Sequence, residues 1–197
     1  MPTALAILAA YLLGSVPFAM ISSRVFGLAD PRTYGSGNPG ATNVLRSGNK
    51  KAALMTLIGD ALKGAVAVIV AQQMGFGDTA IALVALAVFI GHLYPVFLKF
   101  KGGKGVATAA GVLLALDPIL GLAVAGTWLL VAYVSRYSSL AALIAAAAAP
   151  VIAVLMHGVT NQTLVVGLLG MALIGKHWQN IQRLMAGQET KIGSKKK

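Results

Sequence analysis

Three segments of this chain gather most of its polar residues, and each combines residue types that bind anions. The first, Gly35–Arg46, is rich in Gly, Ser, Asn and Thr and ends on an arginine. Glycines allow backbone N–H groups to converge on an anion, and Arg46 can bind a phosphate through two parallel hydrogen bonds. A polar turn that caps a helix is the alternative, because Gly, Ser, Asn and Pro are common turn residues. These residues alone do not decide between the two interpretations.

The second segment, Gly91–Thr108, contains Gly-Gly-Lys-Gly at residues 102–105, directly before an apolar stretch. Such a turn offers a phosphate free amides, the positive end of a helix dipole and a lysine charge. It is not a Walker A loop, because Gly105 stands where that motif needs a Ser or Thr for magnesium. We expect Lys104, left uncovered by its glycine neighbours, to bind phosphate. Lys99 and Lys101 are expected to be membrane-surface anchors.

The third segment, His177–Glu189, places an imidazole, an amide and a guanidinium at intervals of three residues, at His177, Asn180 and Arg183. Residues three apart share one face of a helix, so the three groups can act together. The alternative is an amphipathic tail with an aromatic residue at the membrane interface. His157 has no basic neighbours and is expected to have no role.

The shortage of acidic residues limits the chemistry that these segments can support. The chain has only five carboxylates, and they do not cluster: Asp30, Asp60, Asp78, Asp117 and Glu189. A magnesium-dependent phosphotransferase needs several carboxylates to hold its metal, and a His-x-x-x-x-Asp acyltransferase dyad is absent, since none of the three histidines is followed by Asp at that spacing. There is no Cys for a thiolate nucleophile. The pattern therefore indicates a cationic, amide-rich pocket that binds phosphorylated substrates and stabilises developing negative charge.

The elements that must position these residues are membrane helices. Hydrophobic residues make up 57% of the 197 residues and charged residues 11%, whereas about a quarter of residues are charged in soluble domains. We predict an all-α integral membrane protein with about seven spans, some of them short, at 3–21, 52–71, 79–98, 105–116, 119–134, 140–156 and 163–174. The stretches 105–116 and 163–174 fall short of the roughly 17 residues that a perpendicular span needs, so five spans are the alternative.

Loop charges predict the orientation of these spans. Lys and Arg occur in the first, third and fifth loops and in the C-terminal segment, whereas the loops around Asp78, around Asp117 and at 157–162 have none. Since basic residues collect on the cytoplasmic side, the N-terminus is expected outside and the C-terminus in the cytoplasm. The formal net charge of +11 then reflects membrane topology and anionic head groups, and not nucleic acid. Residues 1–192 are expected to form one transmembrane domain, followed by a basic tail at 193–197.

Taken together, the three segments resemble the signature blocks of the bacterial acyl-phosphate:glycerol-3-phosphate acyltransferase family, the PlsY family. The matching residues are Ser-Gly-Asn-Pro-Gly-Ala-Thr-Asn from Ser36, Gly-His-Leu-Tyr-Pro from Gly91 with Lys-Gly-Gly-Lys-Gly-Val-Ala-Thr up to Thr108, and His-Trp-Gln-Asn-Ile-Gln-Arg-Leu from His177. The blocks occur in the family's order, and the resemblance extends over nearly the whole sequence.

The resemblance implies transfer of a fatty acyl group from acyl phosphate to the 1-hydroxyl of sn-glycerol 3-phosphate, the first acylation step of phospholipid biosynthesis. The products are lysophosphatidate and phosphate. The expected partners are acyl phosphate, glycerol 3-phosphate and membrane lipids, with no nucleic acid, no cofactor and no obligate protein partner. The expected location is the bacterial inner membrane, with the site near the cytoplasmic face.

The resemblance also implies the site. The expected catalytic residues are Ser36, Arg46, Lys104, His177 and Asn180, which position glycerol 3-phosphate and stabilise charge. The loop Gly102–Gly105, with Thr108, is assigned to the phosphate of the donor. The remaining residues expected to bind substrate are Gly37, Asn38, Thr42, Asn43, Gly102, Gly103, Gly105 and Glu189. His177 is either the general base or a residue that orients the substrate, in which case a phosphate oxygen of the donor accepts the proton.

A small transporter or channel for a phosphorylated solute is the alternative function, because polar residues at helix ends also mark solute paths. Against it, ionisable residues within the spans are few. The exceptions are Asp60 and Lys63, three residues apart on one helix face, which we expect to form an ion pair unless Lys63 reaches the surface pocket.

Overall fold

A computed structural model describes residues 2–193 of the chain and shows a helical bundle. Within these residues the helices are α1 (Pro2–Gly14), α2 (Phe18–Val25), α3 (Ala41–Leu45), α4 (Lys50–Gln73), α5 (Asp78–Leu93), α6 (Val106–Leu116), α7 (Pro118–Ser135), α8 (Ser138–His157), α9 (Asn161–Lys176) and α10 (Trp178–Met185), with a 3-10 turn, η1 (Val96–Leu98). Residues 194–197 of the predicted basic tail lie outside the described residues.

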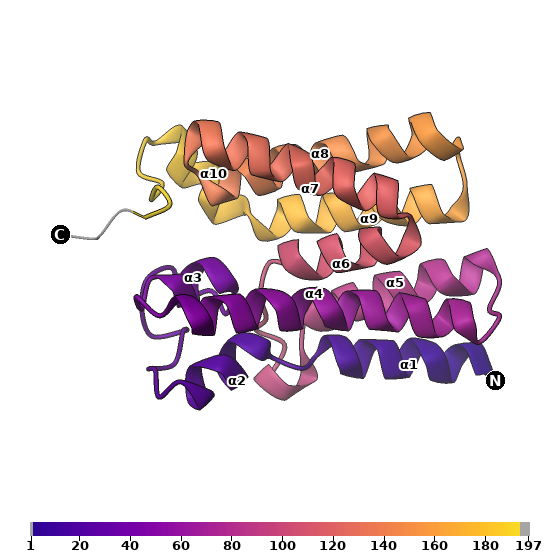
Figure 1. Cartoon of the computed structure of the whole chain (residues 1–197), viewed down its shortest axis with the longest axis horizontal. Helices are drawn as coiled ribbons and strands as arrows, with labels where there is room; N and C mark the ends of the chain where they lie inside the picture. Colours follow the sequence, from indigo (N-terminus) through magenta and orange to yellow (C-terminus); the bar gives the residue numbers. More distant parts are fainter. Residues whose placement is uncertain (1, 194–197) are drawn as a thin grey trace.

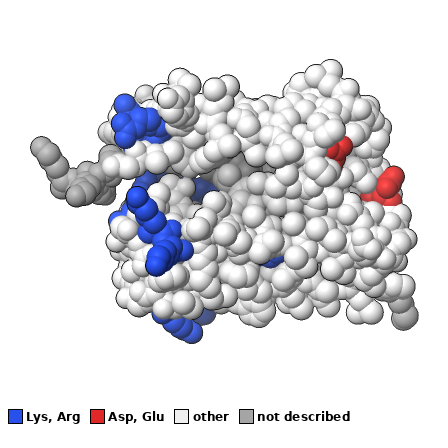
Figure 2. All heavy atoms as spheres, viewed as in Figure 1, with Lys and Arg blue, Asp and Glu red and all other residues white. Residues whose placement is uncertain are grey.

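The long helices lie side by side along the longest axis of the molecule (Figure 1). One group holds α1, α4 and α5 with the short helices α2 and α3, and the other holds α7, α8 and α9. The short helix α6 joins the groups, because it packs against α4 on one side and against α7 and α9 on the other. Lys and Arg gather at the end where α3 and α10 lie, and the visible acidic residues lie at the opposite end (Figure 2).

All seven predicted apolar stretches contain helix, but five helical segments are long and apolar enough to cross a membrane. They are Pro2–Val25, Lys50–Gln73, Asp78–Leu98, Pro118–Ser135 and Ser138–His157. The helix α6 is too short by this measure, so the number of spans stays a prediction. The chain is thus an all-helical, multi-pass membrane protein.

The first stretch is not one continuous helix, as the prediction of a span over 3–21 assumed. Helix α1 ends at Gly14, and α2 begins at Phe18 after Pro17. Proline has no N–H to donate and disfavours a helical conformation of the residue before it, which explains the break. The carbonyl oxygen of Val16, which lies in the break, accepts a hydrogen bond from Lys63 Nζ of α4 at 2.8 Å.

Glycines allow the helices to approach closely, as the abundance of small residues predicts. A Cβ atom on Gly111 of α6 would overlap the backbone of Ala61 in α4, and one on Gly64 of α4 would overlap the carbonyl oxygen of Thr108 in α6. The contact between α1 and α5 is of the same kind, since a Cβ on Gly91 would overlap the carbonyl oxygen of Tyr11. Backbone therefore meets backbone at these crossings.

Two helical glycines test this packing. The variant Gly111→Ala is expected to lower the free energy of unfolding by about 1–3 kcal/mol, the usual cost of overpacking. The matched variant Gly126→Ala adds a methyl group where no other atom lies within 4 Å, and it is expected to be neutral or stabilising by up to about 1 kcal/mol. Thermal unfolding of both proteins in one detergent makes the comparison, and equal stability would contradict the close α4–α6 crossing.

Candidate active site

A cavity of about 820 Å³ lies between the two groups of helices and opens on the face shown in Figure 2. At the end that carries the basic residues it is lined by polar side chains from all three segments singled out in the sequence. These are Ser36, Asn38, Thr42, Asn43, Arg46, Lys104, His177, Asn180 and Glu189, together with Lys50, Ser138, Ser139 and Thr190. We call this polar end the mouth of the cavity.

Beyond the mouth the cavity is apolar. Small residues of α8, Ala142, Ala145, Ala146 and Ala149, form one wall, and Leu169 of α9 lies on another. From Ser138 to Ala149 the wall runs about 16 Å, at 1.5 Å per helical residue. That length matches an extended chain of about 14 carbon atoms, since three backbone bonds span about 3.5 Å. The cavity can therefore hold a hydrocarbon chain with its polar end at the mouth.

Lys104 is held at the mouth by a network of side chains from four elements. Its Nζ donates a hydrogen bond to Asn180 Oδ1, and Asn180 Nδ2 donates to Glu189 Oε1 at 2.6 Å. The carboxylate of Glu189 also accepts from Ser139 Oγ at 2.7 Å and from Arg183 Nε at 2.7 Å. Glu189 therefore joins the C-terminal segment to α8 and α10.

This environment changes the ionisation of Lys104. Burial, together with the nearby positive charge of Arg183, lowers the pKa of Lys104 to about 8, against the opposing effect of Glu189. For Glu189, burial opposes ionisation, but the hydrogen bonds from Arg183, Ser139 and Asn180 outweigh it and hold the pKa of the carboxyl below its usual value. At pH 7 the mouth therefore contains an ammonium and a carboxylate.

His177 is buried and neutral. Burial lowers its pKa to about 4, and the charge of Lys104 adds to this effect. Its Nδ1 lies 2.8 Å from the carbonyl oxygen of Leu173. A carbonyl oxygen only accepts hydrogen bonds, so the proton of the neutral ring is on Nδ1 and Nε2 is left as an acceptor. His177 can therefore orient a hydroxyl group at neutral pH.

Asn43 shapes the first polar segment. Its Oδ1 accepts a hydrogen bond from the backbone N–H of Ser36 at 2.9 Å, and its Nδ2 donates to the carbonyl oxygens of Pro31 at 2.6 Å and Tyr34 at 3.2 Å. The side chain is buried and saturated by these bonds, so it positions the loop that carries Ser36. The first segment is thus both an ordered turn and part of the mouth.

The glycines of the second segment serve a different purpose from the expected one. Gly102 and Gly103 do not line the large cavity, and the N–H of Gly103 donates to the carbonyl oxygen of His92 at 3.2 Å. A Cβ on Gly103 would meet the His92 ring, and one on Gly105 would meet Phe89. The glycines therefore allow the loop to pack against α5. Lys104 itself is half-buried and lines the cavity.

Two other residues expected to bind substrate also lie away from the cavity lining. Thr108 is fully buried where α6 crosses Gly64 of α4, whereas its neighbours Ala107 and Ala109 line the cavity. Gly37 forms an exposed turn with a φ of +68°. The helical periodicity of α6 turns Thr108 away from the mouth, which corrects the placement expected for it.

Sequence reasoning missed Ser138 and Ser139, which start α8 at the mouth. Ser138 Oγ lies 3.2 Å from Thr42 Oγ1, so a hydrogen bond joins the first polar segment to α8 across the cavity. The signal in the sequence was the Ser-Ser pair before an apolar stretch, a common pattern at a helix start.

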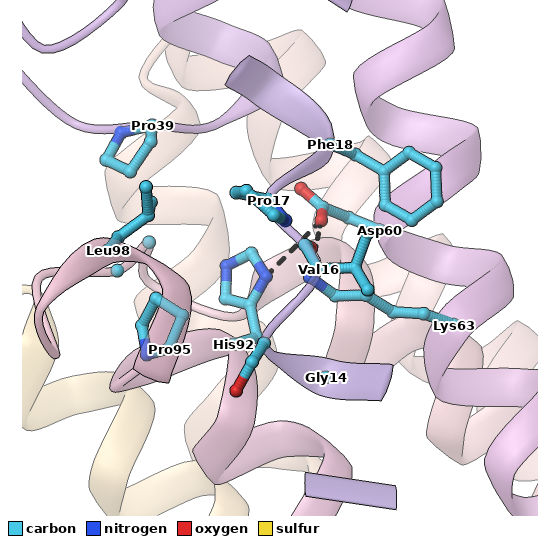
Figure 3. A pocket seen from close by; sticks show the side chains of 13 residues that line it. Gly14, Val16, Pro17, Phe18, Pro39, Asp60, Lys63, His92, Pro95 and Leu98 are labelled. Carbon is cyan, nitrogen blue, oxygen red and sulfur yellow. Dashed lines mark hydrogen bonds and ion pairs between the residues drawn. The ribbon is translucent and has the colours of Figure 1, made fainter. Parts of the chain in front are cut away.

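A second group of charged residues lies beside the mouth. Lys63 Nζ is 2.8 Å from Asp60 Oδ1, which confirms the predicted ion pair, and His92 Nδ1 is 3.4 Å from the same oxygen (Figure 3).

At the end of α8 away from the mouth, His157 Nε2 lies 2.8 Å from Asp117 Oδ2, a contact that the sequence did not suggest. Among residues 2–193, no three His, Asp or Glu side chains come together as metal ligands would.

The apolar cavity of this membrane bundle ends in a cationic, hydrogen-bonding mouth. These features are typical of a class of protein that brings an anionic group and a hydrocarbon chain together. Comparison with known proteins identifies the family. The family model for glycerol-3-phosphate acyltransferase matches residues 4–187, and the chain belongs to this family.

Named relatives agree along the whole chain. A glycerol-3-phosphate acyltransferase of Dechloromonas aromatica is 82% identical over 197 residues, covering 100% of both chains. One from Burkholderia vietnamiensis is 63% identical over 195 residues, covering 98% of this chain and 92% of the relative. A crystal structure of PlsY, an integral membrane glycerol 3-phosphate acyltransferase, in its glycerol 3-phosphate form has a TM-score of 0.93 at 36% identity, covering 98% and 96% of the two chains. The lysophosphatidic acid form of PlsY has a TM-score of 0.91.

The ionisation of Lys104 predicts how anion binding depends on pH. A pKa of about 8 means that the ammonium is lost as the pH rises through 8, so the affinity for sulfate, an anion whose charge is constant in this range, is expected to fall about tenfold between pH 7 and pH 9. Lys104→Arg keeps its charge throughout this range and is expected to remove that fall. Isothermal titration with sulfate measures both, and a wild-type affinity that is the same at pH 7 and pH 9 would contradict the assignment.

Proposed function

We propose that this protein transfers a fatty acyl group from acyl phosphate to the 1-hydroxyl of sn-glycerol 3-phosphate, as the first acylation step of phospholipid biosynthesis. The observation that carries the proposal is the junction of the apolar cavity with the mouth that contains Lys104, Asn180 and His177. The family and the named forms of PlsY, with glycerol 3-phosphate and with lysophosphatidic acid, support the same reaction.

Acyl phosphate suits this site as the donor. It is a mixed anhydride, so it already contains a good leaving group. In the reaction the 1-hydroxyl oxygen of glycerol 3-phosphate bonds to the acyl carbon, and the bond between that carbon and the phosphate oxygen breaks. Inorganic phosphate leaves with the electron pair, and the acyl group remains on glycerol 3-phosphate as lysophosphatidate. Cationic and amide groups at the mouth stabilise the negative charge that develops on the acyl oxygen and the leaving phosphate.

The roles of the residues follow from their positions. Lys104 and Arg46 bind phosphate oxygens, because both line the mouth and carry positive charge. Ser36, Asn38 and Asn180 add hydrogen bonds that position glycerol 3-phosphate. Glu189 acts on the substrate through Asn180 and Arg183, and Asn43 acts through the loop that it shapes. The glycines at 102, 103 and 105 set the path of the loop that carries Lys104.

His177 orients the glycerol hydroxyl in this proposal. A general base at neutral pH works best with a pKa near 7, and the pKa of His177 is about 4. Its Nε2 can accept a hydrogen bond from the 1-hydroxyl without taking the proton. An oxygen of the departing phosphate, which gains charge as the bond breaks, then takes that proton.

The fatty chain of the donor lies in the apolar part of the cavity, and its carbonyl group lies at the mouth. This placement needs residues 1–192 to act as a single domain, because α4, α6, α7, α8 and α9 all line the cavity. No cofactor and no protein partner enter the proposed reaction. The family and the chemistry of the site favour this function over transport of a phosphorylated solute.

We further propose seven spans, with the N-terminus outside, the C-terminus in the cytoplasm and the mouth at the cytoplasmic face of the bacterial inner membrane. The gathering of Lys and Arg at the end that carries α3 and α10 supports this orientation (Figure 2). Glycerol 3-phosphate would then reach the mouth from the cytoplasm.

An assay with purified protein tests the activity. With acyl phosphate and radiolabelled glycerol 3-phosphate, we expect labelled lysophosphatidate and equimolar phosphate. Lys104→Ala is expected to lower kcat/KM by about 100- to 1,000-fold, the usual effect of removing a group that stabilises transition-state charge. Lys101→Ala removes an exposed lysine three residues away and is expected to keep wild-type activity. Folded wild-type protein that forms no lysophosphatidate would refute the proposal.

The orientation can be tested with single cysteines, because the natural chain has none. Val159 and Gln188 are both exposed, and they lie before and after α9 in the chain. Single cysteines at these two positions are compared in intact bacterial cells. A membrane-impermeant maleimide is expected to label Val159→Cys and to leave Gln188→Cys unlabelled until the cells are opened. The reverse pattern would invert the proposed topology, and labelling of both in intact cells would exclude a crossing between them.

A further inference from the structure

Three ionisable side chains form a buried cluster that the proposed reaction does not use. Asp60, Lys63 and His92 are each at most 7% exposed, and Asp60 lies between the other two (Figure 3). Replacing a buried ion pair with apolar residues is often neutral or stabilising, so stability alone does not explain such a cluster. Its contacts with the surrounding backbone suggest another purpose.

The first of these contacts fixes the cluster itself. Lys63 Nζ donates to the carbonyl oxygen of Val16 at 2.8 Å, in the break between α1 and α2, and lies 5.9 Å from the centre of the Phe18 ring. Asp60 is therefore held by an ammonium that is itself bound to another element. Oδ1 of Asp60 in turn lies 3.4 Å from Nδ1 of His92, so the carboxylate faces that edge of the ring.

The second contact joins His92 to the loop that carries Lys104. The carbonyl oxygen of His92 accepts the N–H of Gly103 at 3.2 Å, and a Cβ on Gly103 would meet Nε2 of the ring. The carbonyl oxygen of Pro39, from the first polar segment, lies 3.2 Å from the position of that same Cβ. Gly103 therefore packs against both the backbone and the ring of His92. Since Gly103 directly precedes Lys104, this contact lies next to the lysine.

A small cavity lies at this junction, and it supports the same interpretation. Asp60, His92, Gly103 and Pro39 all line it, and its volume of about 10 Å³ is close to the space of one water molecule. Asp60 and His92 also line the large cavity. The cluster is thus in contact with both polar segments at the point where they meet the site.

We infer that the Asp60–His92 pair, fixed by Lys63, is a positioning device that holds the Gly102–Lys104 loop so that Lys104 points into the mouth. This inference rests on the proposed function, in which Lys104 binds a substrate phosphate. None of the three residues is assigned contact with the substrate. A shift of about 1 Å in such a charge can cost about 100-fold in rate, so the support of the loop matters as much as the lysine.

The test compares two histidines that each contact an aspartate. His92→Phe keeps a ring against Gly103 but removes the contact with Asp60, whose carboxylate stays paired with Lys63. His157→Phe removes the analogous contact with Asp117 at the other end of the molecule. We expect His92→Phe to fold, to lose 10- to 100-fold in kcat and to show faster hydrogen exchange at Gly102–Gly105. We expect His157→Phe to match the wild type in both.

The pH profile separates positioning from a general loss of structure. In the wild type, kcat/KM is expected to fall above about pH 8 as Lys104 loses its proton. Burial sets this midpoint together with four charged groups: Arg183 of α10, Glu189, Arg46 directly after α3, and Lys176 of α9. If His92→Phe releases the loop, Lys104 becomes more hydrated and the midpoint moves to higher pH. His157→Phe leaves it unchanged.

Folded His92→Phe with wild-type kcat, hydrogen exchange and midpoint would overturn the inference. If His92→Phe does not fold, the double variant Asp60→Asn with Lys63→Met replaces it, because it removes both charges and leaves neither buried alone. The same losses are expected, and wild-type values would again overturn the inference. An inactive wild-type protein would refute the proposed function instead, and the hydrogen exchange at Gly102–Gly105 would still decide whether His92 holds the loop.

Discussion

The site depends on one ammonium group, that of Lys104, being kept charged while it is half-buried between membrane helices. An isolated charge is expensive to bury, so partners must surround it. Here the ammonium donates to the neutral amide of Asn180, which in turn donates to the carboxylate of Glu189. Glu189 also accepts hydrogen bonds from Ser139 and from the positively charged Arg183. Its single negative charge is therefore shared between Arg183 and Lys104 and does not fully neutralise Lys104. The mouth thus stays net positive and can still attract an anion.

The same constraint explains why the elements around the mouth are so closely tied to each other. The lysine side chain extends from a loop, and a loop is fixed only by what it packs against. Gly103 and Gly105 let this loop lie on α5, and α5 is in turn crossed closely by α1 at Gly91. Close backbone contacts between helices therefore help to fix the position of the Lys104 ammonium, although they lie some distance from it.

Much of this arrangement could be predicted from local sequence patterns. Apolar stretches indicate helices because the pattern is local, and the basic loops indicate one end of the molecule because charge in a membrane protein follows topology. The Asp60–Lys63 pair follows from helical spacing alone. The joining of the three polar segments at one cavity was predicted through their resemblance to one family.

The features that could not be predicted from the sequence are those that depend on which neighbouring helix covers a residue. Thr108 is buried against Gly64 because α4 and α6 cross there. The loop glycine Gly103 accommodates His92 because the loop packs against α5. No local sequence pattern contains either contact.

The open flank of the cavity has a consequence for the end of the reaction. Leu54, Leu57 and Leu129 line the cavity and are 47–62% exposed, so the cavity is open along this side of the bundle. In a membrane this surface faces the acyl tails of the surrounding lipid, so a chain in the cavity is in contact with the leaflet along its side. A newly made lysolipid can then slide sideways into the bilayer without its tail ever meeting water. The exit of the tail then does not include the unfavourable exposure of its apolar surface to water.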